Sequence, residues 1–304
     1  MIQIEQAVSK IIKNIQGVCN TTKMIIAFSG GLDSTLVLNL AKMAMGNKQI
    51  VAVNVDFGPY AYLKTKQIVQ SVCHDLNIQL IQLDAQKEQL SIMKRGPDCN
   101  LCTRKVKLGL IRKKYFGNII LTGSNQSDSW GHYGIAFKNN IFSPLFNYSK
   151  QEIKEMVRYL NINVRRIGEH NNREGCKLKH LLKPLASTAY HGRAVDEANE
   201  LLLKILNKNN IKAQMANVKI IGPLNHNIAL INVFPLPEQI YRHKIQVKIA
   251  QLDTIEESYF VEQCVELIAK SNKGQFNNIR SRHWIEKGRL QPEFAFPIQV
   301  KWLL

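Results

Sequence analysis

Short apolar runs alternate with amphipathic stretches through about half of this chain, and this alternation constrains its fold more than any other feature. Four runs have the length and composition of buried β-strands, at residues 24–28, 50–55, 78–83 and 118–122. Helical patterns surround and separate them, at residues 3–17, 34–45, 62–76, 103–115 and 149–160. Such alternation predicts an α/β fold, in which a parallel sheet carries helices on both faces.

The carboxyl ends of these four strands are rich in glycine and polar residues. They read Ser29-Gly30-Gly31, Asp56, Asp84 and Gly123-Ser124-Asn125. Open parallel sheets bind their ligands at this edge. We therefore expect the principal binding site where these four segments meet.

The pattern changes near residue 187, and the remaining chain carries no chemical motif. Helical patterns cover residues 190–207 and 258–270, and strand patterns cover residues 218–221 and 228–233. We predict two domains: an α/β domain over residues 1–187 and a smaller α+β domain over residues 188–304. The second domain could recognise substrate or form a homodimer, and its sequence favours neither role.

The segment Ser29-Gly30-Gly31-Leu32-Asp33-Ser34 joins the first strand to its helix. Glycines let the backbone approach a phosphate closely, and the N–H groups at a helix N-terminus bind negative charge. No Gly-Lys-Ser/Thr follows, so the segment is not a Walker A motif. The plainer alternative is a glycine turn whose Asp or Ser caps the helix.

This segment resembles the SGGxDS pyrophosphate loop of the PP-loop ATP pyrophosphatase superfamily. The resemblance implies an adenine nucleotide alpha hydrolase-like fold and cleavage of ATP to AMP and pyrophosphate. A carbonyl oxygen would be adenylated, and a nucleophile would then displace AMP. A later segment, Ser143-Pro144-Leu145 followed by Ser149-Lys150-Gln151-Glu152-Ile153, is also similar to the family pattern. The resemblance extends over residues 22–184.

The same resemblance implies roles for individual residues. Pyrophosphate would bind to Ser29, Gly30, Gly31 and Ser34, and the catalytic Asp33 would organise the loop or bind Mg²⁺, which prefers oxygen ligands. Asp56 would lie near the adenosine, although a strand-end Asp that caps a turn explains this residue equally well. Gly123 would contact the nucleotide.

Three cysteines form a second candidate site. Cys99 and Cys102 make a CxxC pair, and Cys176 lies 74 residues after Cys102. A CxxC pair is a natural chelate, and three interpretations compete. Zinc would need a fourth ligand such as His170 or His180, a redox dithiol needs only the pair, and a [4Fe–4S] cluster on three cysteines would leave one iron open. Buried structural roles are expected for the other cysteines, Cys19, Cys73 and Cys264.

The order of SGGxDS, a CxxC before a basic helix and a distant Cys resembles the iron–sulfur tRNA thiolases. It is also similar to the three-cysteine sulfur-insertion enzymes of nickel-pincer cofactor synthesis. The resemblance implies that Cys99, Cys102 and Cys176 hold a [4Fe–4S] cluster and are catalytic, with zinc as a lesser alternative. Sulfide or a persulfide carrier would supply the sulfur.

The charge of the chain points to an anionic partner. It has 41 Lys and Arg against 23 Asp and Glu, a net charge of +18, of which residues 1–184 carry +14. Cations gather beside the CxxC, and we predict contacts with RNA phosphates for Lys94, Arg95, Arg104 and Lys105. A solvated helix face that also serves ATP phosphates is the alternative.

No apolar run approaches the ~18 residues of a membrane-spanning helix, and the first residues lack the pattern of a signal peptide. We therefore expect no membrane association and a cytoplasmic location.

The motifs, the cysteines and the charge together lead to one hypothesis, an ATP-dependent sulfurtransferase acting on tRNA. Sulfur insertion into a small nucleotide-derived cofactor and a catalytically silent nucleotide- or RNA-binding protein are the alternatives.

Overall fold

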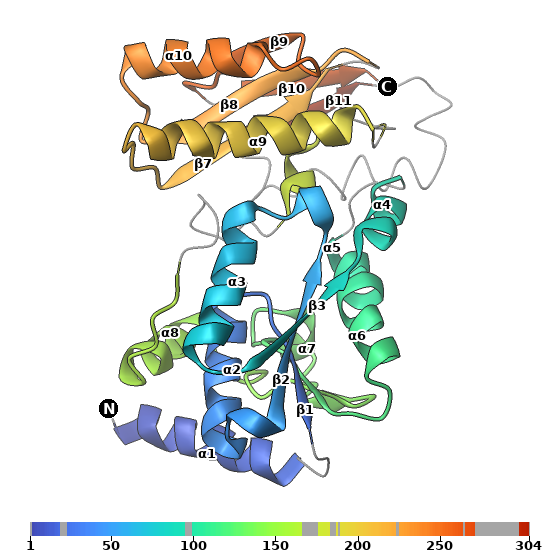
Figure 1. The fold of residues 1–304 in the computed structure, drawn as a ribbon, viewed down its shortest axis with the longest axis vertical. Helices are drawn as coiled ribbons and strands as arrows, with labels where there is room; N and C mark the ends of the chain where they lie inside the picture. Colours follow the sequence, from blue (N-terminus) through green and yellow to red (C-terminus); the bar gives the residue numbers. More distant parts are fainter. Residues whose placement is uncertain are drawn as a thin grey trace. The chain divides into compact units, whose positions relative to one another are not determined.

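The computed structural model describes most of the chain (Figure 1). The described residues are 2–18, 23–94, 99–165, 176–182, 187, 189–222, 225–263, 265–270 and 298–303. Residue contacts divide the chain into two compact units. The first unit comprises residues 1–56, 64–85 and 107–167, and the second unit comprises residues 57–63, 86–106 and 168–304. The units interleave along the sequence, and the predicted domain ranges 1–187 and 188–304 stay a prediction.

A six-stranded, mostly parallel sheet forms the centre of the first unit, in the order β3-β2-β1-β4-β6-β5. The strands are β1 (Met24–Ala27), β2 (Ile50–Asp56), β3 (Gln79–Asp84), β4 (Ile120–Leu121), β5 (Phe137–Lys138) and β6 (Ile141–Phe142). Only β5 runs antiparallel to its neighbour, β6. The predicted parallel sheet is confirmed, with two short strands that the apolar pattern did not indicate.

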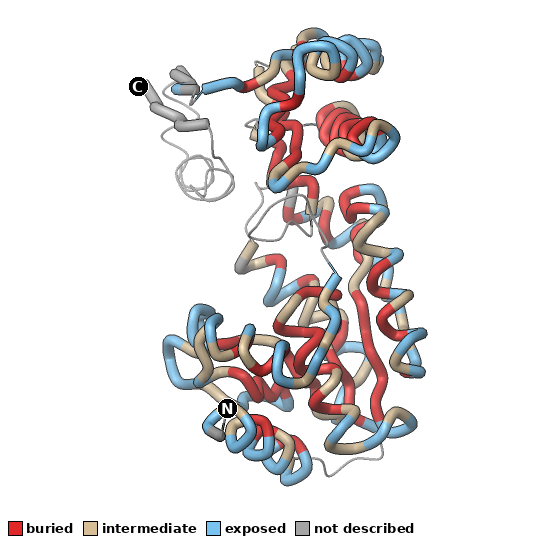
Figure 2. Tube along the Cα trace, turned by 90° about the vertical axis from the view of Figure 1, so that its left-hand side faces the viewer, coloured by how far each residue is buried: buried red, intermediate tan, exposed pale blue. Residues whose placement is uncertain are grey.

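Alternate residues of the central strands pack against opposite layers of helices. In β1, Met24 and Ile26 belong to a core with α1 (Ile2–Val18), α2 (Leu32–Met45), α3 (Leu63–Asp75) and α8 (Lys150–Tyr159). Ile25 packs on the other face with Ile111 of α6 (Leu108–Lys114), near the short helix α7 (Ser129–His132). The first three residues of β1 and the first five of β2 are buried, whereas β3 is partly exposed (burial along the chain is drawn in Figure 2). Burial on both faces explains why β1 and β2 read as continuous apolar runs.

The helices of the first unit begin and end close to the predicted bounds. The predicted start of α8 is confirmed in atomic detail, because Ser149 and Glu152 form a reciprocal capping box. The predicted basic helix over residues 103–115 is confirmed in part. Residues Cys102–Lys107 form a π-helical turn, and α6 follows it.

The C-terminal part of the second unit packs helices on a three-stranded sheet. The helix α9 (His191–Lys208) packs on β7 (Met215–Ile221), which pairs antiparallel with β8 (Ile228–Phe234). The helix α10 (Gln239–Ala250) packs on β9 (Glu257–Phe260), which pairs parallel with β8. A separate parallel pair joins β10 (Val265–Lys270) and β11 (Ile298–Leu303).

The predicted helix over residues 258–270 is wrong. Its first residues form β9, where hydrogen bonds to β8 satisfy the backbone, and residues 265–270 form β10. Pairing with strands distant in sequence overrides a local helical pattern here.

The second unit also contains the three cysteines of interest and the segments around them. Cys99 begins α5 (Cys99–Leu101), Cys102 begins the π-helical turn, and Cys176 precedes a helical turn at Lys177–His180. A turn at Gly58–Tyr60 and α4 (Gln86–Lys94) belong to the same unit. Within the described part of the chain, no helix has the length and apolar character needed to cross a lipid bilayer.

Candidate functional site

The glycine loop leaves the first turn of α2 open to a ligand. Gly30 has a φ of +74°, a left-handed conformation that favours glycine, and Gly31 is the N-cap of α2. No side chain caps this helix, so the N–H groups of its first turn are not bonded by a cap. The loop is braced from within, because the Ser29 and Ser34 hydroxyls lie 3.1 Å apart and Ser34 donates to the Gly31 carbonyl at 3.1 Å. This is the geometry of a phosphate-binding loop.

Asp33 lies in the first turn of α2 and faces the first residue of α8. Its Oδ2 accepts a hydrogen bond from Lys150 Nζ at 2.5 Å. Its Oδ1 is buried and has no hydrogen-bond partner among the described residues. An ionised carboxylate can bind further donors or a cation. The arrangement leaves one carboxylate oxygen and one partly exposed ammonium group beside the loop.

Gly123 allows the end of β4 to approach this loop closely. A Cβ at residue 123 would lie 2.9 Å from both Asp33 Cβ and Ser34 N. Just before it, Thr122 Oγ1 lies 2.8 Å from Ser143 Oγ, which ties β4 to the segment after β6. The resemblance placed Gly123 at the nucleotide, and the geometry puts its backbone against the loop.

Two polar residues of β2 lie at the same edge of the sheet. Asn54 is buried and donates from Nδ2 to the Phe28 carbonyl at 2.9 Å, which fixes the residue just before the loop. Asp56 ends the strand and forms an ion pair with Lys66 of α3 at 3.0 Å. The first unit therefore brings together Ser29, Gly30, Gly31, Asp33, Ser34 and Gly123, with Asp56 at the next strand end.

In the second unit, Cys102 and Cys176 contact the same buried side chain. The Cys102 thiol donates to Gln89 Oε1 at 3.0 Å, and Gln89 Nε2 donates to Cys176 Sγ at 3.6 Å. Cys99 lies three residues before Cys102 at the start of α5. The cysteines described in the chain, which include Cys73, form no disulfide.

The residue after Cys176 anchors that segment. Lys177 is 1% exposed, and its Nζ lies 2.6 Å from Asp196 Oδ1 and 2.6 Å from Glu200 Oε1 of α9. It also donates to the Pro59 carbonyl at 3.0 Å and lies over the Tyr62 ring. Burial raises the pKa of Tyr60, and the nearby Asp196 and Cys176 raise it further.

Three soft sulfur ligands on one unit suit a [4Fe–4S] cluster with one open iron, and zinc would need a fourth ligand besides them. Two of the sulfurs share the Gln89 carboxamide. No group of three or more His, Cys, Asp and Glu side chains converges on a common point among the residues that the structure describes. His180 is buried near Cys176, whereas His170, Cys19 and Cys264 lie outside the described residues. Three cysteine sulfurs are chemically suited to bind a metal centre. In the described residues two of these cysteines, Cys102 and Cys176, contact the same side chain, Gln89.

The predicted RNA-binding cations surround the CxxC in sequence. Arg104 and Lys105 are exposed on the π-helical turn. Lys94 ends α4, and its side chain, like the whole of Arg95, lies outside the described residues.

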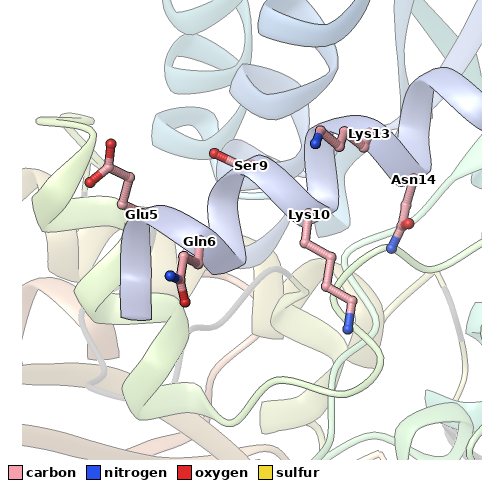
Figure 3. Close-up of a pocket in the computed structure, with 6 residues that line it drawn as sticks. All are labelled: Glu5, Gln6, Ser9, Lys10, Lys13 and Asn14. Atoms are coloured by element: carbon pink, nitrogen blue, oxygen red, sulfur yellow. The ribbon is translucent and has the colours of Figure 1, made fainter. Parts of the chain in front are cut away.

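A separate surface hollow of about 580 Å³ follows the polar face of α1 (Figure 3). It is lined by Glu5, Gln6, Ser9, Lys10, Lys13 and Asn14, none of which belongs to the loop or to a strand end.

Sequence reasoning assigned no role to three residues of these sites, namely Lys150, Gln89 and Lys177. Lys150 lies inside the SKxEI segment that carried part of the family resemblance, so a signal for it existed. Lys177 follows a candidate cysteine directly. For Gln89 the sequence offers no signal, because its contacts arise only from the tertiary fold.

The parallel sheet and the glycine loop at its carboxyl edge define a PP-loop ATP pyrophosphatase. A family model described as NAD synthase matches residues 4–171, more than half of the chain, and the chain belongs to this family.

Similar proteins carry several names. An uncharacterized protein of Methanocaldococcus jannaschii is 28% identical, over 51% of this chain and 62% of its own length. The tRNA-5-methyluridine(54) 2-sulfurtransferase of Thermotoga maritima is 30% identical, over 41% of this chain and 44% of its own length. The matches thus span less than two thirds of these relatives. The solved NH3-dependent NAD synthetase of Campylobacter jejuni, in complex with nitrate, is 18% identical with a TM-score of 0.44, over 69% of this chain and 86% of that one.

Proposed function

We propose that this chain is an ATP-dependent sulfurtransferase that adenylates a carbonyl oxygen of a tRNA base and replaces that oxygen with sulfur. The observation that carries the proposal is the pairing of Cys102 and Cys176 through Gln89 in a chain that also has a complete PP-loop. The names of relatives such as the Thermotoga maritima sulfurtransferase support it.

The first unit would perform the ATP half of the reaction. The open N-terminus of α2 would bind the phosphates, and Asp33 Oδ1, which has no hydrogen-bond partner in the described part of the chain, fits a ligand to Mg²⁺. The base oxygen would attack the α-phosphorus, and the bond to pyrophosphate would break, so that pyrophosphate leaves with the electron pair. Lys150 would hold the Asp33 carboxylate in place and add positive charge near the phosphates.

The second unit would supply the sulfur. Cys99, Cys102 and Cys176 would hold a [4Fe–4S] cluster, for which zinc is the lesser alternative, and Cys102 and Cys176 already share a partner. Such a cluster, when bound, supplies an open iron to which sulfur from sulfide or a persulfide carrier can bind. The protein's own contribution is to hold three thiolates and to exclude other donors.

A tRNA substrate would contact the cations beside the CxxC. Arg104 and Lys105 are exposed there, and Lys94 and Arg95 precede the CxxC in sequence. Contacts of this kind bind phosphates, give affinity without base choice and weaken with salt. We place the reaction in the cytoplasm, where thiols stay reduced.

Insertion of sulfur into a small nucleotide-derived cofactor is the second candidate. The family match over residues 4–171 favours it, because that family is named for NAD synthase rather than for an RNA substrate. A catalytically silent nucleotide- or RNA-binding protein is the third candidate, and the intact SGGLDS segment argues against it.

Mass spectrometry of tRNA nucleosides from a strain that lacks the gene tests the proposal. Loss of one thionucleoside, restored by the wild-type gene and not by a Cys176→Ala gene, is the expected result. An unchanged set of thionucleosides would contradict action on tRNA. In the purified protein, ATP-dependent pyrophosphate release without tRNA but with a small nucleotide would favour the second candidate.

A further inference from the structure

Gln89 lies at the centre of the cysteine site, although the sequence gives it no motif. It sits on α4, is 4% exposed, and contacts sulfurs from two distant parts of the chain. Its Oε1 accepts from the Cys102 thiol at 3.0 Å, and its Nε2 donates to Cys176 Sγ at 3.6 Å. A single carboxamide therefore links the CxxC segment to the third cysteine.

Glutamine is suited to this task because its side chain carries an acceptor and a donor on one rigid plane. A carboxylate offers only acceptors when ionised, and an apolar side chain of the same length offers neither. The two contacts also differ in direction, so the carboxamide is oriented by its neighbours. A metal-bound thiolate has no proton to donate, so the bond from Cys102 to Oε1 belongs to the metal-free protein, whereas the bond from Nε2 to Cys176 Sγ is also possible with a thiolate acceptor.

Cys176 is held differently from the CxxC cysteines. Cys99 and Cys102 lie on helical segments, α5 and the π-helical turn. Cys176 has an extended backbone, with φ −149° and ψ 119°, and the buried Lys177 anchors the next residue. The hydrogen bond from Gln89 Nε2 links the sulfur itself to α4.

We propose that Gln89 is a positioning residue of the cysteine site, which brings Cys176 to the CxxC pair so that the three can bind one metal centre. This inference rests on the proposed function of the cysteines. Partners that orient metal ligands typically change metal affinity by about 10- to 100-fold when they are removed.

Titration of the reduced, full-length apoprotein with Co²⁺ alone, without oxygen, tests the inference. Co²⁺ reports thiolate ligation through sulfur-to-cobalt charge-transfer absorption, whose intensity follows the number of bound thiolates. Gln89→Leu removes both hydrogen bonds and adds no atom that could bind the metal. We expect its absorption to fall to that of Cys176→Ala, and its Co²⁺ affinity to weaken by about 10- to 100-fold. Glu88→Leu, on the exposed side of α4, is the matched control.

The outcomes separate the two proposals. Wild-type absorption and affinity in a folded Gln89→Leu protein would overturn the role of Gln89 alone. Wild-type protein without thiolate absorption would overturn the metal centre, and with it the cysteine half of the proposed function. Thermal unfolding of each variant checks the fold, and Gln89→Ala provides a second replacement if Gln89→Leu does not fold.

Discussion

Lys150 and Asp33 form an ion pair that joins the first turn of α8 to the first turn of α2, across 117 residues of sequence. The pair lies beside the glycine loop and leaves Asp33 Oδ1 without a partner among the described residues. Through this pair the SKxEI segment lies beside the glycine loop, the proposed phosphate site, although it is far from the loop in sequence.

Lys150→Met should therefore weaken ATP binding. The substitution removes a charge beside the phosphates and releases the Asp33 carboxylate, and because Lys150 is 46% exposed we expect a loss of about three- to tenfold. Isothermal titration with ATP and Mg²⁺ measures the effect. Lys154→Met, on an exposed position of the same helix, should bind ATP like the wild type. Equal affinity in both variants would show that Lys150 takes no part in the site.

Gly123→Ala should disturb the same loop by steric conflict. The added Cβ would lie 2.9 Å from Asp33 Cβ and Ser34 N, so β4 or α2 must shift. Overpacking of this kind costs about 1–3 kcal/mol of unfolding free energy, and ATP binding should fall with it. Urea denaturation with and without ATP measures both effects. A Cβ at Gly17 meets nothing within 4 Å, so Gly17→Ala is the control and should be neutral or stabilising.

Lys177→Met should destabilise the second unit. It leaves Asp196 and Glu200, which are only 22% and 25% exposed, without their shared cation. Removal of one member of a buried ion pair costs about 3 kcal/mol or more. The double variant Lys177→Met, Glu200→Gln should recover part of this loss in urea denaturation, because one uncompensated carboxylate is gone. Lys204→Met, exposed on α9, should leave stability unchanged.

Cys73 should make the stability of the first unit fall at alkaline pH. Burial raises the pKa of its thiol from 9.0 to about 12 in the folded protein. Between these values the unfolded chain loses the proton and the folded chain keeps it, so the free energy of unfolding decreases as pH rises, by at most about 1.4 kcal/mol per pH unit. Below pH 9.0 the effect is absent.

Urea denaturation of the wild type and Cys73→Ala over this pH range measures the difference in slope. Tyrosines with raised pKa values contribute to both proteins and cancel in the comparison. Parallel slopes would contradict the assignment. In the same range iodoacetamide should leave Cys73 unmodified in the folded protein.

The fold of the first unit could be predicted because β1 and most of β2 are buried on both faces and a glycine loop separates β1 from α2. β1 and β2 lie almost where the apolar runs indicated, and the capping box of Ser149 marked the start of α8. The strands β5 and β6 are two residues long, too short for any pattern to indicate them. The predicted helix over residues 258–270 failed because strand pairing decides the structure there.

Some residues of the candidate sites could likewise be predicted from local sequence, whereas others could not. Ser29 to Ser34 could be proposed as a phosphate loop because phosphate binding needs a short contiguous motif, and the structure places this segment between β1 and the start of α2. Gln89 and Lys177 could not be identified, because their roles depend on partners 87 and 19 residues away that only the fold brings near. Gly123 was predicted from the family resemblance alone. The physical reason for a glycine there is the close approach of its backbone to Asp33, which depends on the tertiary fold.

The interleaving of the two units has a consequence for how the gene can be divided. The chain passes between the units after residues 56, 63, 85, 106 and 167. A stop codon after residue 187 would keep the turn at residues 58–60 and Lys177 but remove Asp196 and Glu200 of α9, to which Lys177 is bound. The gene therefore offers no single break point at which the cysteine segments could be exchanged, fused or expressed apart from the C-terminal sheet.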